Sequence, residues 1–152
     1  MIEYRTPAGA SGVLLRDAAG FRFTGAQPTN HWPIRVATSR LTRGGALRPG
    51  ESMYSANAAF RLVYQTDGNL VVYRIEDGVA LWSTRTFGMS AGRAVMQRDG
   101  NLVLYAPDGT VHWSSATHGA AAANGFLTMQ SGGNLVITGR AGNVVWATNT
   151  GN

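Results

Sequence analysis

The segments QTDGNLVVY (residues 65–73), QRDGNLVLY (97–105) and QSGGNLVIT (130–138) are three copies of one nine-residue pattern. They begin at positions 65, 97 and 130, so the period is 32 to 33 residues, and each copy is followed by a tryptophan, in LWSTRT, HWSSAT and VWATNT. A fixed period of roughly 20 to 50 residues is typical of a repeated supersecondary unit. The sequence therefore predicts three copies of one β-hairpin over residues 58–150.

Glycine occupies the same turn position in all three copies, at Gly68, Gly100 and Gly133. This recurrence predicts a three-residue loop in which a type I turn is followed by a left-handed residue, a conformation that glycine adopts readily. Such a loop sets Gln65 opposite Asn69. A two-residue Asp-Gly turn would instead place the Gln65 amide among apolar residues, at a cost of roughly 1 to 3 kcal/mol, and we reject that register.

The register divides the side chains of each hairpin between two faces, because neighbouring residues of a strand point to opposite sides of a sheet. In the first copy it pairs Tyr64 with Leu70, Val63 with Val71, Leu62 with Val72 and Arg61 with Tyr73. The predicted core face carries Leu62, Tyr64, Leu70 and Val72. The opposite face gathers polar side chains around one valine, and the second copy repeats this arrangement. These candidate site residues are Gln65, Asp67, Asn69, Val71 and Tyr73 in the first copy and Gln97, Asp99, Asn101, Val103 and Tyr105 in the second.

A carboxylate, two amides and a phenol around a small apolar patch suit the hydroxyl groups and the C–H face of a pyranose. Each neutral hydrogen bond contributes only about 0.5 to 1.5 kcal/mol, so one site is expected to be weak and repetition to supply avidity. The pattern therefore predicts a carbohydrate-binding module.

The repeated pattern QxDxNxVxY with its spaced tryptophans resembles the bulb-type (monocot-type) mannose-binding lectin family. The resemblance covers residues 39–152, from the lead-in LTRGGALRPGESMYSANAAFRLVYQ to the ending VVWATNTGN. It implies an all-β fold, the β-prism II, in which three four-stranded antiparallel sheets surround a pseudo-threefold axis. It also implies that the aspartate and asparagine of each intact copy bind the axial O2 of mannose, the glutamine O3 and the tyrosine O4, while the valine packs on the sugar ring.

The third copy departs from the pattern, because Gly132 and Thr138 stand where the other copies have aspartate and tyrosine. We expect a weak or lost site there. Its remaining site residues are Gln130, Asn134 and Val136. Plant members commonly carry a cysteine where this chain has Gly68, and the chain has no cysteine, which favours a bacterial or fungal member of the family.

Other conspicuous residues have simpler interpretations. Trp82, Trp113 and Trp146 are interpreted as core, because regularly spaced tryptophans in a repeat are more often buried than offered to sugars. Arg61 and Arg93 lie opposite the site tyrosines, where they solvate the rim or, as the alternative, favour acidic or phosphate-bearing glycans. The three histidines share no metal-ligand spacing, and no nucleophile–base arrangement is present, so we expect no metal, no cofactor and no enzymatic activity.

The composition of the 152-residue chain agrees with a turn-rich β-protein, since it has 20 glycines and only 14% charged residues. All 13 basic residues are dispersed arginines, which does not favour nucleic-acid binding. No apolar run is long enough to insert into a membrane. The N-terminal stretch lacks the apolar segment of a secretory signal, so we expect a soluble protein that is cytoplasmic or released by a route without a signal.

Residues 1–38 form a predicted extension before the lectin-like domain of residues 39–152. Within it, GVLLRDAAGFRFTG is typical of two strands joined by a turn at residues 17–20. This hairpin is expected to be packed on the prism or swapped with it, and the alternatives are a decayed fourth copy of the repeat or an arm for oligomerisation or partner binding.

The sequence leaves three functions open. The first is a lectin that binds mannose-containing glycans or polysaccharides through two intact sites. The second is a lectin-like bacteriocin or defence protein that uses sugar binding for targeting, and the third is a structural or interaction module without sugar binding. The resemblance also implies a possible homodimer formed by exchange of the C-terminal strand.

Overall fold

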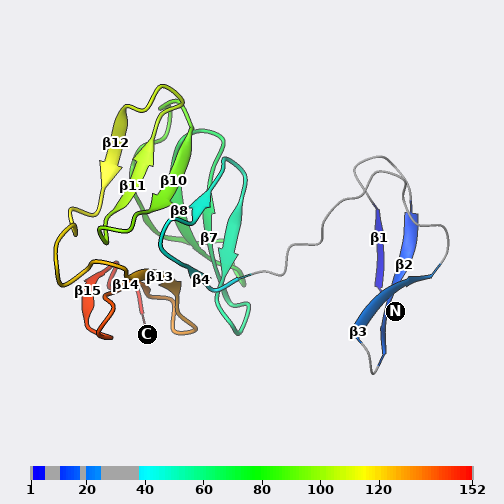
Figure 1. The fold of residues 1–152 in the computed structure, drawn as a ribbon. Helices are drawn as coiled ribbons and strands as arrows, with labels where there is room; N and C mark the ends of the chain where they lie inside the picture. Colours follow the sequence, from blue (N-terminus) through cyan, green and yellow to red (C-terminus); the bar gives the residue numbers. More distant parts are fainter. Residues whose placement is uncertain (1, 6–10, 18–19, 25–37, 152) are drawn as a thin grey trace. The chain divides into compact units, whose positions relative to one another are not determined.

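The computed structural model describes residues 2–5, 11–17, 20–24 and 38–151 (Figure 1). The chain divides into two compact units, Met1–Val36 and Ala37–Asn152. Every regular element in the described residues is a β-strand. Accordingly, this part of the chain contains no helix that could cross a bilayer.

The first unit holds a three-stranded antiparallel sheet in the order β1, β2, β3. Its strands are β1 (Ile2–Arg5), β2 (Ser11–Asp17) and β3 (Gly20–Thr24). β2 and β3 form the predicted hairpin, with Asp17 paired with Gly20, and residues 18–19 of its turn lie outside the described residues. β1 adds a third strand to this hairpin, pairing along β2 from Ile2 to Arg5.

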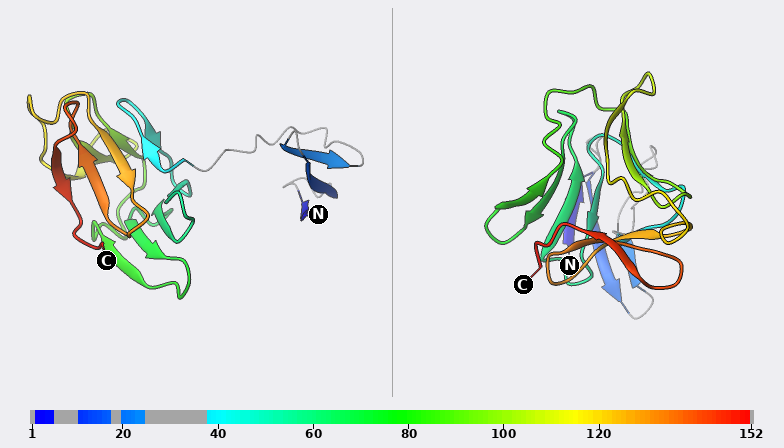
Figure 2. Two further views of the ribbon diagram at one scale, coloured as in Figure 1. Left: turned by 90° about the horizontal axis from the view of Figure 1, so that it is seen from below. Right: turned by 90° about the vertical axis from the view of Figure 1, so that its left-hand side faces the viewer.

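The second unit consists of three four-stranded antiparallel sheets (Figures 1 and 2), which confirms the predicted β-prism II. The first sheet has the order β6 (Ser52–Tyr54), β7 (Phe60–Tyr64), β8 (Leu70–Arg74), β9 (Ala80–Ser83). The second has the order β5 (Ala46–Leu47), β10 (Arg93–Met96), β11 (Leu102–Tyr105), β12 (Val111–Ser114). The third has the order β4 (Arg40–Leu41), β13 (Phe126–Met129), β14 (Leu135–Thr138), β15 (Val144–Ala147). The two central strands of each sheet are one predicted hairpin.

The register of the first hairpin is the predicted one, from Tyr64 paired with Leu70 to Arg61 paired with Tyr73. Gly68 closes the loop at φ 90°. A Cβ at this glycine would lie 2.2 Å from the carbonyl oxygen of Met89. Both the backbone conformation and this close approach therefore require glycine.

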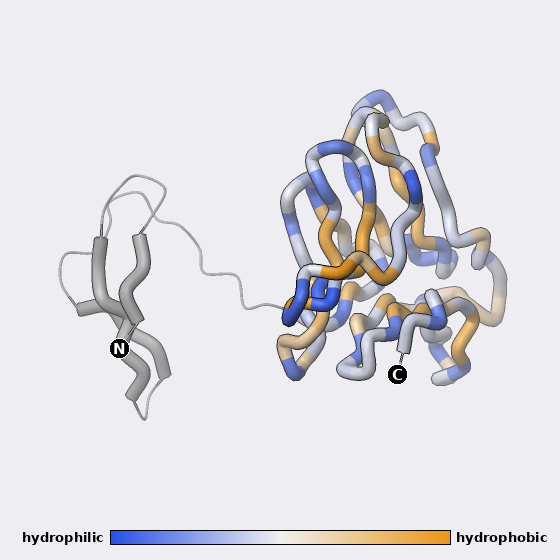
Figure 3. Tube along the Cα trace, turned by 180° about the vertical axis from the view of Figure 1, so that it is seen from behind, coloured by the Kyte–Doolittle hydropathy of each residue, from blue (hydrophilic) through white to orange (hydrophobic). Residues whose placement is uncertain are grey.

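The core of the second unit is formed by the faces that the sequence pattern assigned to it. All four predicted core residues of the first hairpin are fully buried, and the apolar stretches concentrate in the central strands (Figure 3). The Tyr64 hydroxyl accepts a hydrogen bond from the Gly92 amide at 3.1 Å, and burial raises the pKa of Tyr64. The interior thus keeps this phenol neutral and hydrogen-bonded.

One tryptophan from each sheet reaches the middle of the second unit. Trp82, Trp113 and Trp146 contact one another edge to face, with ring centroids 5.5 to 5.9 Å apart, and all three pack against the core. The rings therefore pack against the core as predicted, although each is only partly buried. Trp146 lies on β15, which pairs with β14 of the same chain, and exchange of this strand between two copies stays a prediction.

Candidate functional site

The polar face of the first hairpin brings its glutamine, aspartate and tyrosine together. The Gln65 amide meets the Tyr73 hydroxyl at 2.6 Å. When the amide oxygen accepts from that hydroxyl, the amide nitrogen donates to both carboxylate oxygens of Asp67 at 3.2 Å. This orientation gives every group a complementary partner. Gln65 therefore links the two ends of the site.

Asp67 is held by the turn that contains it. Its Oδ1 accepts a hydrogen bond from the backbone N–H of Asn69 at 2.9 Å, which is the geometry of an Asx turn. The side chain is exposed. Because a carboxylate has about four lone-pair positions, Asp67 retains the capacity to accept from a ligand hydroxyl.

The amide of Asn69 has a fixed orientation. Its Oδ1 accepts from the Thr84 hydroxyl at 3.1 Å and from the backbone N–H of Thr86 at 3.1 Å. A backbone N–H can only donate, so the amide oxygen must face the threonines and Nδ2 must face away. No group among the described residues accepts from Nδ2. An acceptor on Asp67 and a donor on Asn69 are thus presented next to each other.

Two buried threonines, Thr84 and Thr86, form a support that holds the Asn69 amide and the turn in place. They were not predicted from the sequence. The hydroxyls of Thr84 and Thr86 lie 2.7 Å apart, and Thr86 donates to the Gly68 carbonyl at 2.7 Å. Equivalent hydroxyl pairs are Ser115 with Thr117 and Thr148 with Thr150. Their signal in the sequence is a hydroxyl residue two and four positions after each repeated tryptophan.

The second hairpin repeats the turn and the oriented asparagine of the first, and its glutamine also meets its tyrosine. The Gln97 amide donates to the Tyr105 hydroxyl, and Asp99 accepts from the Asn101 N–H at 2.9 Å. The Asn101 Oδ1 accepts from the Ser115 hydroxyl at 3.0 Å and from the Thr117 N–H at 3.2 Å. The five predicted residues of this copy therefore form a second constellation of the same kind.

The third hairpin keeps the two threonines that orient its asparagine, but it has no aspartate. Asn134 Oδ1 accepts from the Thr148 hydroxyl at 3.1 Å and from the Thr150 N–H at 3.4 Å. Gly132 supplies no acceptor side chain and Thr138 no phenol. The third hairpin therefore retains the asparagine donor, at Asn134, but lacks the carboxylate acceptor that the other two hairpins have.

The valines of the three sites form their floor. Val71, Val103 and Val136 are only 2 to 3% exposed. The contact predicted between the valine and a sugar ring is therefore limited to a narrow edge of each side chain. Hydrogen-bonding groups, not apolar surface, dominate what these faces present.

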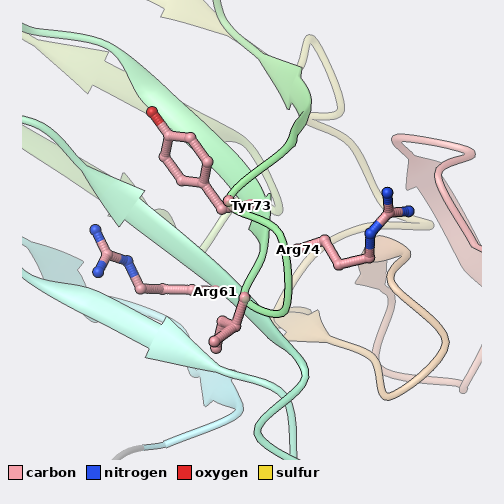
Figure 4. A pocket seen from close by; sticks show the side chains of 5 residues that line it. Arg61, Tyr73 and Arg74 are labelled. Atoms are coloured by element: carbon pink, nitrogen blue, oxygen red, sulfur yellow. The ribbon is translucent and has the colours of Figure 1, made fainter.

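Arginine stands beside the tyrosine of each complete constellation. Arg61 is paired with Tyr73 across the hairpin and Arg93 with Tyr105, and the guanidinium carbons lie 6.0 and 5.1 Å from the ring centroids. Figure 4 shows the Arg61 and Tyr73 side chains extending in the same direction, while Arg74 extends the other way. The described part of the chain contains no cluster of acidic or histidine side chains arranged to hold a metal ion.

The known proteins that resemble this chain are lectins. No protein-family model matches the chain. Among curated proteins, the B-type lectin plumieribetin of Scorpaena plumieri is 33% identical over 77 residues, which make up 51% of this chain and 66% of that protein. The chain thus spans slightly less than two thirds of the length of this relative.

Solved structures match over more of their length. The mannose-specific agglutinin from snowdrop (Galanthus nivalis) bulbs, complexed with methyl-α-D-mannoside, is 36% identical with a TM-score of 0.60, over 75% of this chain and 98% of that one. A monomeric monocot mannose-binding lectin from Gastrodia elata is 33% identical with a TM-score of 0.68, over 76% of this chain and 100% of that one. The likeness therefore concerns sequence as well as fold.

Proposed function

The chain belongs to the bulb-type, or monocot, mannose-binding lectin family, and from this premise we propose that it binds mannose or mannose-type residues of glycans through its first two hairpins. The chain is a carbohydrate-binding lectin of this family.

The observation that carries the proposal is the pair formed by a carboxylate acceptor and an oriented amide donor. A sugar hydroxyl both donates and accepts, so one hydroxyl can donate to Asp67 and accept from Asn69 Nδ2 at the same time. Gln65 and Tyr73 stand beside this pair for the neighbouring hydroxyls. The pair occurs at Asp67 and Asp99 and is missing at Gly132, which supports two sites per chain.

The similar proteins support mannose as the type of sugar. The snowdrop agglutinin was solved with methyl-α-D-mannoside, and the site residues of this chain match the pattern of that family in two copies. By this likeness the aspartate–asparagine pair takes the axial O2, the glutamine O3 and the tyrosine O4.

The contacts also set the strength of binding. Neutral hydrogen bonds contribute about 0.5 to 1.5 kcal/mol each and those to a charged group about 1.5 to 3 kcal/mol, and association itself costs several kcal/mol. One site is therefore expected to bind a monosaccharide with a Kd of about 1 mM. Clustered mannose on a glycan surface would be bound more tightly, because both sites engage at once.

Calorimetric titration with methyl α-mannoside tests the proposal. We expect two sites in the unmodified protein, one in Asp67→Ala or Asp99→Ala, and none in the double variant. Asp108→Ala is a matched control, because Asp108 accepts from the Thr110 N–H at 2.9 Å in a similar turn that belongs to no site. It should keep both sites. No heat from the unmodified protein, or unchanged binding by the double variant, contradicts the proposal.

A further inference from the structure

The two complete sites share one feature that mannose recognition does not use. Each has an arginine paired with its tyrosine, Arg61 with Tyr73 and Arg93 with Tyr105. In the third hairpin, Phe126 takes the arginine position, opposite Thr138. The third hairpin therefore has no arginine at this position of its own, and the guanidinium carbon of Arg40, on the neighbouring β4, lies 4.1 Å from the Phe126 ring centroid.

Among the residues that the structure describes, no acidic group neutralises the charge of these arginines. Neither Arg61 nor Arg93 makes an ion pair with any residue of the described ranges, and the buried Nε of Arg61 has no hydrogen-bond partner there. The neighbouring Arg74 differs, because it is 2.6 Å from an Asp77 carboxylate oxygen, which lowers the pKa of Asp77. Arg61 is thus the uncompensated cation at this side of the first site.

A shallow cleft lies where the first site ends. It is lined by Arg61, Tyr73, Arg74, Ile75 and Gly78 (Figure 4). Tyr73 belongs both to the site and to the cleft. Because Tyr73 contributes to both, the cleft beside Arg61 adjoins the first site.

We propose that Arg61 and Arg93 select mannose-type sugars that carry an anionic group, a phosphate or a carboxylate, on carbon 6. This inference rests on the proposed function, in which the tyrosine takes O4, because carbon 6 projects from the ring position next to O4. Guanidinium groups bind phosphate and carboxylate oxygens by paired, charge-assisted hydrogen bonds. The sites thus distinguish acidic from neutral glycans.

The test compares each protein's affinity for mannose 6-phosphate and for mannuronic acid with its affinity for mannose, measured by calorimetry at low salt. One charge-assisted hydrogen bond corresponds to a ratio of about ten. We expect that ratio in the unmodified protein and a ratio near one in Arg61→Gln/Arg93→Gln. The variant Arg48→Gln/Arg140→Gln changes two exposed arginines outside the sites, removes the same net charge, and should keep the high ratio.

The outcomes separate the two proposals. Mannose binding with a ratio near one in the unmodified protein overturns this inference and leaves the proposed function intact, whereas absence of all sugar binding overturns both. If the ratio falls equally in the two double variants, the preference comes from net charge, and the inference about Arg61 and Arg93 is overturned. If the Arg61→Gln/Arg93→Gln variant fails to fold, the single variants Arg61→Gln and Arg93→Gln replace it, and each should bring the ratio near one at its own site only.

Discussion

The side chain of Asn69 is oriented by groups that lie outside its own hairpin. Thr84 supplies a hydroxyl and Thr86 a backbone N–H, both at 3.1 Å from the amide oxygen. The amide nitrogen is thereby turned outward before any ligand arrives, which lowers the cost of ordering the site on binding. The chemistry of a single residue thus depends on partners 15 and 17 positions along the chain.

Thr84→Val tests this support. The substitution removes the hydroxyl that serves both the Asn69 amide and the Leu70 N–H, so it leaves a buried donor unpaired. We expect the free energy of unfolding to fall by about 1 to 3 kcal/mol and the first sugar site to weaken, as measured by urea denaturation and calorimetry.

Thr148→Val is the matched control, because Thr148 makes the same two bonds, to Asn134 and to the Leu135 N–H. It should lose a similar amount of stability and leave sugar binding at the first two hairpins unchanged. Equal sugar affinity in the two variants would show that orientation of the amide does not matter.

Each hairpin could be predicted from its sequence because its determinants are local. The glycine at φ 90° sets the loop, and alternation of apolar residues then assigns the faces. The outer strands could not be predicted in the same way. β4 and β5 contain two residues each, too few to show a period, and they are strands only because the hairpins offer them edges to pair with.

The threonine support was also missed, for a physical reason. Its contacts depend on how the strand carrying the tryptophan follows the hairpin, and the register between β8 and β9 shifts at Val72 and Tyr73. A bulge of this kind re-aims side chains, so the alternating pattern alone does not place Thr84 and Thr86 beside the loop.

The third hairpin allows a site to be rebuilt on an intact support. Asn134 is already oriented by Thr148 and Thr150, and a Cβ at Gly132 would meet nothing within 4 Å. We expect Gly132→Asp/Thr138→Tyr to restore the missing acceptor and phenol without loss of the hairpin. Calorimetry with methyl α-mannoside should then count three sites per chain.

Two further variants sharpen this prediction. Adding Asn134→Ala removes the oriented donor and should return the count to two. A count that stays at two in Gly132→Asp/Thr138→Tyr, with the protein folded, would show that the acceptor–donor pair is not sufficient to make a site.

The three tryptophans couple the sheets to one another. Trp82, Trp113 and Trp146 come from different sheets, and each ring meets the other two at 5.5 to 5.9 Å. Edge-to-face aromatic pairs add about 0.5 to 1.5 kcal/mol each to the burial of the rings. A sheet that opened alone would lose two of these three contacts, so we expect the three sheets to open as one cooperative unit.

Amide hydrogen exchange under native conditions measures this coupling, because cooperative units show a common opening free energy. Trp113→Leu removes both contacts of a ring on the second sheet and should lower the opening free energy of all three sheets together, by about 2 to 4 kcal/mol. Val144→Thr changes a residue that is 62% exposed and should alter stability by less than about 0.5 kcal/mol. A loss confined to the second sheet would mean that the sheets are stabilised separately and that the tryptophan contacts do not join them.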